Sequence, residues 1–147
     1  MKKRLLLLSN SSLPGQNYLE FALNPISRFI ENQGLKVVFI PFAGVTFSYD
    51  DYTNKVKNAL SALNLKITGI HETEDKKSLI ENSDIIMVGG GNTFRLLERC
   101  YHYELLEPIQ QAVDNGASYI GWSAGSNLAG PTISTTNDMP IIQPQNF

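Results

Sequence analysis

Short runs of apolar residues alternate along this chain with longer stretches in which apolar positions recur every three or four residues. The short runs predict buried strands at 4–9, 35–41, 65–70, 84–88 and 119–122. The longer stretches predict helices over 17–32, 50–63, 76–82, 93–101 and 108–115. Strands and helices that alternate in this way predict an α/β protein, with a mostly parallel sheet covered by helices on both faces.

Glycine and proline refine these boundaries. Gly34 and Gly116 predict helix ends, and Pro25 predicts a kink or a division in the first helical stretch. No repeat or composition shift divides the chain, so residues 1–147 are expected to form one α/β domain. Residues 131–147 are rich in turn formers and carry no stop signal for any element. We therefore expect a doubly wound fold whose C-terminal part is missing.

Composition excludes several classes of function. The chain has 147 residues, 42% of them hydrophobic, which suits one domain with a core. Its net charge of -2 provides no basic surface for binding nucleic acid. Cys100 is the single cysteine and fits a reducing compartment. The apolar run of Leu5–Leu8 is too short for a signal peptide, and no run approaches a membrane span. These features predict a cytoplasmic protein with no membrane partner.

The fifth predicted strand runs into Gly121-Trp122-Ser123-Ala124-Gly125. A serine between two glycines at a strand-to-helix bend is typical of the nucleophile of a hydrolase, because the sharp turn exposes its hydroxyl. The alternative is a tight turn in which the glycines only permit close packing. No histidine follows Ser123, and a serine without a base is a weak nucleophile.

The fourth predicted strand ends in a second glycine-rich segment, Gly89-Gly90-Gly91-Asn92-Thr93. Backbone N–H groups in such a loop suit an anion, either a phosphate or the oxyanion of an acyl-transfer reaction. The usual phosphate-binding glycine patterns are absent. An oxyanion hole would use the N–H groups of Gly91 and Ala124, since both loops follow parallel strands. A turn with no ligand is the alternative.

The remaining candidates are weaker. Asp138 could orient a histidine, although Asn137-Asp138-Met139-Pro140 also suits an ordinary turn. His71 and His102 are isolated, which does not favour a metal site. Cys100 lies in a helical stretch, so a thiol nucleophile is not expected.

Five segments of the chain resemble peptidase E, the bacterial α-aspartyl dipeptidase family of serine peptidases. They occur in family order, as Leu5–Ser11, Ile40–Thr46, Val88–Phe94, Tyr119–Gly125 and Thr135–Pro140. The resemblance implies a three-layer fold like that of class I glutamine amidotransferases, of flavodoxin-like type. It also implies hydrolysis of dipeptides with an N-terminal aspartate, with no cofactor and no metal.

The resemblance implies roles for individual residues. Ser123 would be the nucleophile, Gly91 and Ala124 the oxyanion donors, and Asp138 part of the charge relay. Gly90 and Asn92 are expected to contact the substrate.

This sequence departs from the family pattern at one point, because the catalytic histidine follows the Asn-Asp-Met-Pro segment in the family and is absent here. The chain is therefore expected to be an impaired peptidase. The alternatives are an inactive truncated fragment, a non-catalytic homologue that binds peptides, and a homodimer in which a second subunit supplies the histidine.

Overall fold

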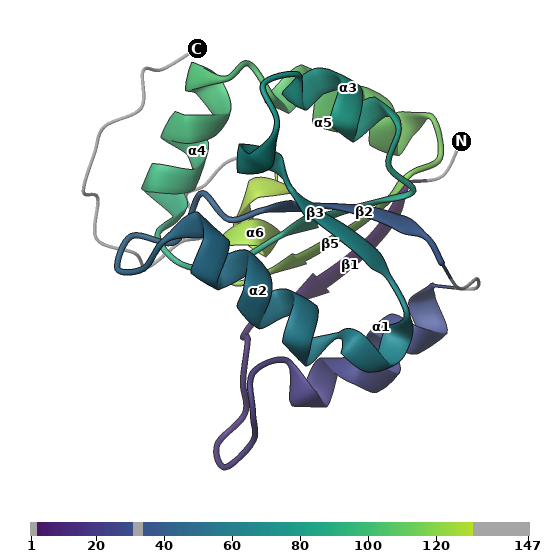
Figure 1. The fold of residues 1–147 in the computed structure, drawn as a ribbon, viewed down its shortest axis with the longest axis vertical. Coiled ribbons are helices and arrows are strands. Elements are labelled where there is room, and N and C mark those ends of the chain that lie inside the picture. The colour runs from purple at the N-terminus through teal and green to yellow at the C-terminus, as the bar shows by residue number, and fades with distance from the viewer. Residues whose placement is uncertain (1–2, 31–33, 131–147) are drawn as a thin grey trace.

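The computed structural model describes residues 3–30 and 34–130, which form a sheet with helices on both faces (Figure 1). The strands are β1 Arg4–Leu8, β2 Lys36–Ile40, β3 Lys66–Gly69, β4 Ile85–Val88 and β5 Ser118–Trp122. They lie in the order β1-β5-β4-β2-β3, and every neighbouring pair is parallel. The α/β fold expected from the alternation of strands and helices is confirmed.

The helices occupy the connections between these strands. They are α1 Leu23–Phe29, α2 Tyr49–Ala59, α3 Lys76–Glu81, α4 Thr93–His102, α5 Leu106–Asp114 and α6 Ala124–Leu128. Short 3-10 turns occur at Glu20–Ala22, Ser61–Leu63 and Ile70–Glu72. Within the described residues, no helix is both long enough and apolar enough to cross a membrane.

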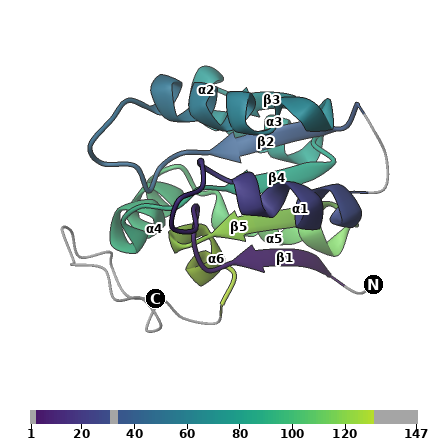
Figure 2. The same ribbon diagram turned by 90° about the horizontal axis from the view of Figure 1, so that it is seen from below.

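Successive residues of the central strands point to opposite faces of the sheet, so two separate cores form. Val37 and Phe39 of β2 pack with α1 and α2, whereas Val38 and Ile40 pack with α3, α4 and α5. Figure 1 shows the strands between these two groups of helices, and Figure 2 shows the sheet from the side on which α1 lies. Burial on both faces explains why the strand sequences are continuously apolar rather than alternating.

The order of the strands brings the candidate loops to one edge. After β3 the chain returns across the sheet to place β4 beside β2, and then β5 between β4 and β1. Because all strands are parallel, the segments that follow β2, β4 and β5 emerge at the same carboxyl edge.

The first helical stretch differs from the prediction of a helix over 17–32 that Pro25 kinks or divides. The chain forms a 3-10 turn and then α1, which begins only at Leu23. The preceding Leu19 is buried at a φ of 58°, and its N–H donates to the carbonyl of Ser11 at 2.6 Å. Tertiary contacts of Tyr18 and Leu19 therefore override the helical pattern there.

Pro25 does not kink α1, because it is the third residue of that helix, where a backbone N–H has no partner within the helix. Pro108 holds the same position in α5, which begins two residues before the predicted start. The stretch predicted as a helix over 50–63 ends at Ala59 and continues as a 3-10 turn. The other predicted elements differ from the observed bounds by one or two residues.

Candidate active site

Ser123 occupies a strained bend between β5 and α6. Its φ of 53° and ψ of -115° lie in a region that residues with a side chain rarely adopt. Its N–H donates to the carbonyl of Leu8 at 2.9 Å, and its carbonyl accepts from the N–H groups of Ser126 and Asn127. The backbone is thus held on both sides of a half-buried side chain.

The two glycines around Ser123 are required by close packing. A Cβ on Gly125 would lie 2.0 Å from the carbonyl oxygen of Val88 in β4. A Cβ on Gly121 would lie 2.6 Å from the carbonyl oxygen of Gly125. Helix α6 can therefore follow β5 at this sharp angle only if both positions lack a side chain. We call Gly121–Gly125 the elbow.

The segment Gly89–Asn92, which we call the glycine loop, is also constrained. Gly91 has a φ of 140°, and a Cβ there would lie 2.2 Å from the carbonyl oxygen of Ala43. The Asn92 N–H donates to that same oxygen at 2.8 Å. The Asn92 side chain accepts from the N–H of Arg95 at 3.1 Å and so caps α4. Asn92, expected to contact substrate, thus also has this structural role.

The structure brings the elbow and the glycine loop together. A Cβ on Gly90 would lie 3.0 Å from the Cβ of Ser123 and 3.3 Å from the carbonyl oxygen of Trp122. Within the described part of the chain, the N–H of Gly91 has no hydrogen-bond acceptor. A serine hydroxyl and an available amide donor on adjacent strand ends are the arrangement that acyl transfer requires.

Three aromatic side chains connect the two loops beneath this site. The Trp122 indole Nε1 donates to the Tyr18 hydroxyl at 2.8 Å. The Tyr18 and Tyr52 hydroxyls are 3.1 Å apart, and the Tyr52 hydroxyl donates to the carbonyl of Gly90 at 2.9 Å. We call these residues the tyrosine bridge. Phe39 stacks on Trp122 with a centroid separation of 5.8 Å.

The groups at the two ends of the tyrosine bridge determine which hydroxyl donates and which accepts in each of its hydrogen bonds. An indole N–H only donates and a carbonyl only accepts, so Tyr18 donates to Tyr52. Burial raises the pKa of both tyrosines above the ordinary value of 10.0, and both hydroxyls remain protonated and able to donate at neutral pH. The bridge links the residue before Ser123 to the residue before Gly91.

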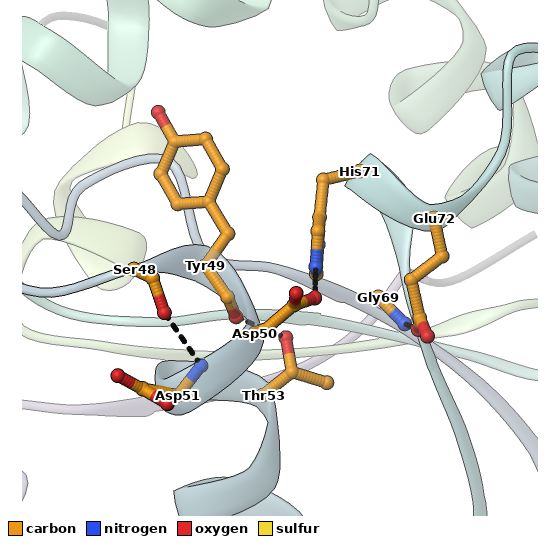
Figure 3. A network of polar contacts seen from close by, with 8 residues as sticks. All are labelled: Ser48, Tyr49, Asp50, Asp51, Thr53, Gly69, His71 and Glu72. Atoms are coloured by element: carbon orange, nitrogen blue, oxygen red, sulfur yellow. Dashed lines mark hydrogen bonds and ion pairs between the residues drawn. The ribbon is translucent and has the colours of Figure 1, made fainter.

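Neither histidine lies beside Ser123. His71 follows β3, which is separated from β5 by two strands, or roughly 14 Å at the usual strand spacing. Figure 3 shows its ring facing Asp50, with Nε2 2.7 Å from Oδ1 of that carboxylate. His102 ends α4 and is exposed against Tyr103.

Cys100 and Asp138 are the remaining sequence candidates. Cys100 is fully buried in α4, and burial raises the pKa of its thiol from 9.0 to about 12, which leaves little thiolate at neutral pH. Asp138 lies outside the described residues. Among the described residues, no group of three or more His, Cys, Asp or Glu side chains is placed to hold a metal ion.

Sequence reasoning missed the tyrosine bridge. Its hydrogen bonds join residues that are 104, 34 and 38 positions apart, so no local motif reveals them. The one available signal is composition, because tyrosines in otherwise apolar stretches need hydrogen-bond partners when they are buried.

The structure thus defines an α/β protein in which a parallel sheet holds a serine at positive φ on a strand-to-helix bend. The model of peptidase family S51 matches residues 5–147. The chain belongs to this family of peptidases.

Relatives and solved structures agree with this assignment. Peptidase E of Shigella flexneri serotype 5b (strain 8401) is 56% identical over 143 residues, as is that of Escherichia coli O6:K15:H31. The match covers 97% of this chain but 62% of each relative. The chain therefore spans less than two thirds of their length.

A crystal structure of a Listeria monocytogenes EGD-e protein described as a peptidase E has a TM-score of 0.73 at 30% identity, covering 90% of this chain and 64% of that one. A peptidase from an acI-B1 Actinobacterium has a TM-score of 0.61 at 17% identity, covering 82% and 54%. This second likeness concerns the fold alone.

Proposed function

We propose that this chain carries the nucleophile and oxyanion part of a serine dipeptidase that acts on dipeptides with an N-terminal aspartate. The observation that carries the proposal is the position of Ser123, strained on its bend and adjacent to the glycine loop. The family assignment and the peptidase E relatives support the same conclusion.

In the proposed reaction, the Ser123 oxygen attacks the peptide carbonyl carbon, and the negative charge develops on the carbonyl oxygen. The N–H groups of Gly91 and Ala124 donate to that oxygen. The C–N bond then breaks, the amine leaves with a proton, and water hydrolyses the acyl-serine ester. Gly90 borders the site and Asn92 holds the loop in place.

The proton must pass from Ser123 to a base, and Asp138 would orient that base. Both histidines of this sequence precede Ser123 and are placed away from it. We therefore propose that the 147 residues alone hydrolyse such dipeptides slowly. Loss of one triad member leaves about 10³–10⁴-fold catalysis over water in well-studied serine peptidases.

The experiment measures release of leucine from Asp-Leu by the purified chain, by Ser123→Ala and by Ser27→Ala. Ser27 is an exposed serine on α1 and serves as the matched control. We expect slow release with the parent chain and Ser27→Ala, and only the uncatalysed rate with Ser123→Ala. An equal rate in Ser123→Ala would refute the role of Ser123, and rapid turnover by the parent would refute the proposed impairment.

A second candidate function is peptide binding without turnover. The distance of both histidines from Ser123 favours it. Titration calorimetry with Asp-Leu distinguishes the two, because a binding protein would give heat of binding but no Ser123-dependent leucine. No heat at millimolar dipeptide would exclude it.

A further inference from the structure

A groove opens to solvent beside the glycine loop, next to the residues that follow β2. Its volume is about 530 Å³. One wall is the segment between β2 and α2, together with the first residue of α2, and the other wall is the first turn of α4. Its lining residues are Gly44, Val45, Phe47, Ser48, Tyr49 and Arg95. We call it the Arg95 groove.

The groove is close enough to Ser123 for one dipeptide to reach both. The wall segment packs directly on the glycine loop, since the Asn92 N–H donates to the carbonyl of Ala43 at 2.8 Å. Strands β2 and β5 are two positions apart, or roughly 10 Å. An extended dipeptide is about 7 Å long, and an arginine side chain covers the remaining distance.

The chemistry of the lining residues favours an anionic and partly apolar ligand. Arg95 is the one residue of the lining that carries a full charge at neutral pH, and its side chain is 34% exposed. Val45 and Phe47 are 52% and 47% exposed and line the same groove, so they present a neighbouring apolar surface to a ligand there.

The guanidinium of Arg95 is incompletely neutralised. Its nearest acidic partner is Glu98, with Nη1 3.6 Å from Oε2, a separation beyond hydrogen-bond distance. The Glu98 carboxylate instead accepts two hydrogen bonds from Arg99, each at 2.5 Å. Two arginines therefore share one carboxylate, and Arg95 retains donors for a bidentate interaction with another.

We propose that the Arg95 groove is a substrate subsite in which Arg95 binds a carboxylate of the dipeptide while Val45 and Phe47 contact an apolar side chain. The inference rests on the proposed function only in taking Ser123 as the position of the scissile carbonyl. A dipeptide such as Asp-Leu has two carboxylates, one on the aspartate side chain and one at the C-terminus.

The test measures binding rather than turnover, so it does not depend on a catalytic base. All variants carry Ser123→Ala, and the dissociation constant for Asp-Leu is measured by titration followed by NMR. Arg95→Gln is expected to weaken binding about tenfold, and Arg95→Lys, which keeps the charge, to weaken it less. Arg28→Gln, an exposed arginine on α1, is the matched control and is expected to bind like the parent.

Two modified ligands identify the carboxylate. Asp-Leu amide lacks the C-terminal carboxylate, and Asn-Leu lacks that of the side chain. Arg95→Gln should leave the dissociation constant unchanged for the ligand that lacks the carboxylate bound by Arg95. For the ligand that keeps this carboxylate, Arg95→Gln should still raise the dissociation constant. Parent-like binding of Asp-Leu by Arg95→Gln, with native circular dichroism, would overturn the proposal, as would no measurable binding by the parent.

The outcomes separate this proposal from the proposed function. If Arg95→Gln weakens binding but Ser123→Ala leaves the hydrolysis rate unchanged, the subsite is retained and the serine mechanism fails. If hydrolysis depends on Ser123 but binding does not depend on Arg95, the subsite alone is wrong.

Discussion

Among single residues, Ser123 is the one whose conformation matters most for the site, and backbone contacts and neighbouring residues hold it there, not its own side chain. The bond from its N–H to Leu8 and the glycines on either side set the backbone. The tyrosine bridge then connects Trp122 to Gly90 through two neutral phenols. Strain of this kind persists only where the surrounding structure over-determines it.

The tyrosine bridge predicts coupled effects on stability. Tyr52→Phe leaves the Gly90 carbonyl without this donor and Tyr18 without its acceptor, so the free energy of unfolding should fall by about 1–2 kcal/mol. Tyr18→Phe should cost a similar amount. The double variant should cost less than the sum of the two by at least about 0.5 kcal/mol, because both act on one network. Urea unfolding measures all three values.

Thr53→Val is the matched control for the bridge. Thr53 is buried on the same helix as Tyr52, and its hydroxyl donates to the Tyr49 carbonyl at 2.7 Å, outside the bridge. The decrease in the free energy of unfolding caused by Thr53→Val should add to the decrease caused by Tyr18→Phe. Additive costs for Tyr18→Phe with Tyr52→Phe would show that the bridge does not act as a unit.

At the scale of elements, the site depends on how closely α6 approaches β4. That approach is set by Gly125, whose backbone conformation is ordinary but whose missing side chain leaves room for the Val88 carbonyl. The elbow could be predicted from the sequence because close packing of a strand against the following helix requires glycine at positions such as Gly121 and Gly125. Periodicity predicts a helix over 17–32 because it carries no information about the positive φ of the buried Leu19.

Gly125→Ala should therefore be strongly destabilising. The added methyl would lie 2.0 Å from a backbone oxygen, so α6 must move away from β4, at a cost of about 3 kcal/mol. Gly15→Ala is the control for backbone strain alone, since Gly15 has a φ of 78° with no atom within 4 Å of the added Cβ. It should cost about 1–2 kcal/mol.

Urea unfolding of both variants at one temperature provides the comparison. If Gly125→Ala and Gly15→Ala lowered the free energy of unfolding equally, the clash at Gly125 would be relieved without moving α6.

At the scale of the whole molecule, two cores enclose several groups that ionise only at high pH. Burial raises the pKa of the Cys100 thiol to about 12, and it also raises the pKa of Tyr18, Tyr52 and Tyr119 above 10.0. Tyr119 donates to the Gly125 carbonyl at 2.6 Å inside one core, and the bridge tyrosines lie in the other.

These groups predict alkaline destabilisation. Above about pH 9 the unfolded chain loses protons that the folded chain keeps, so the unfolded state binds fewer protons and the free energy of unfolding falls as pH rises. Each group contributes up to about 1.4 kcal/mol per pH unit above its unfolded pKa. Urea unfolding between pH 8 and 11 should show this decline, and Cys100→Ala should make it shallower from pH 9. A flat profile would contradict the burial of these groups.

Period, propensity and glycine geometry are local properties of the chain, so the alternation of strands and helices, the serine bend and the glycine loop could be predicted from the order of the amino acids. The folded arrangement was needed to show that β4 and β5 are neighbours, that Tyr18 and Tyr52 connect their loops, and that His71 pairs with Asp50. These depend on contacts between residues far apart in the chain, and local patterns carry no information about which distant partner a buried polar group will find.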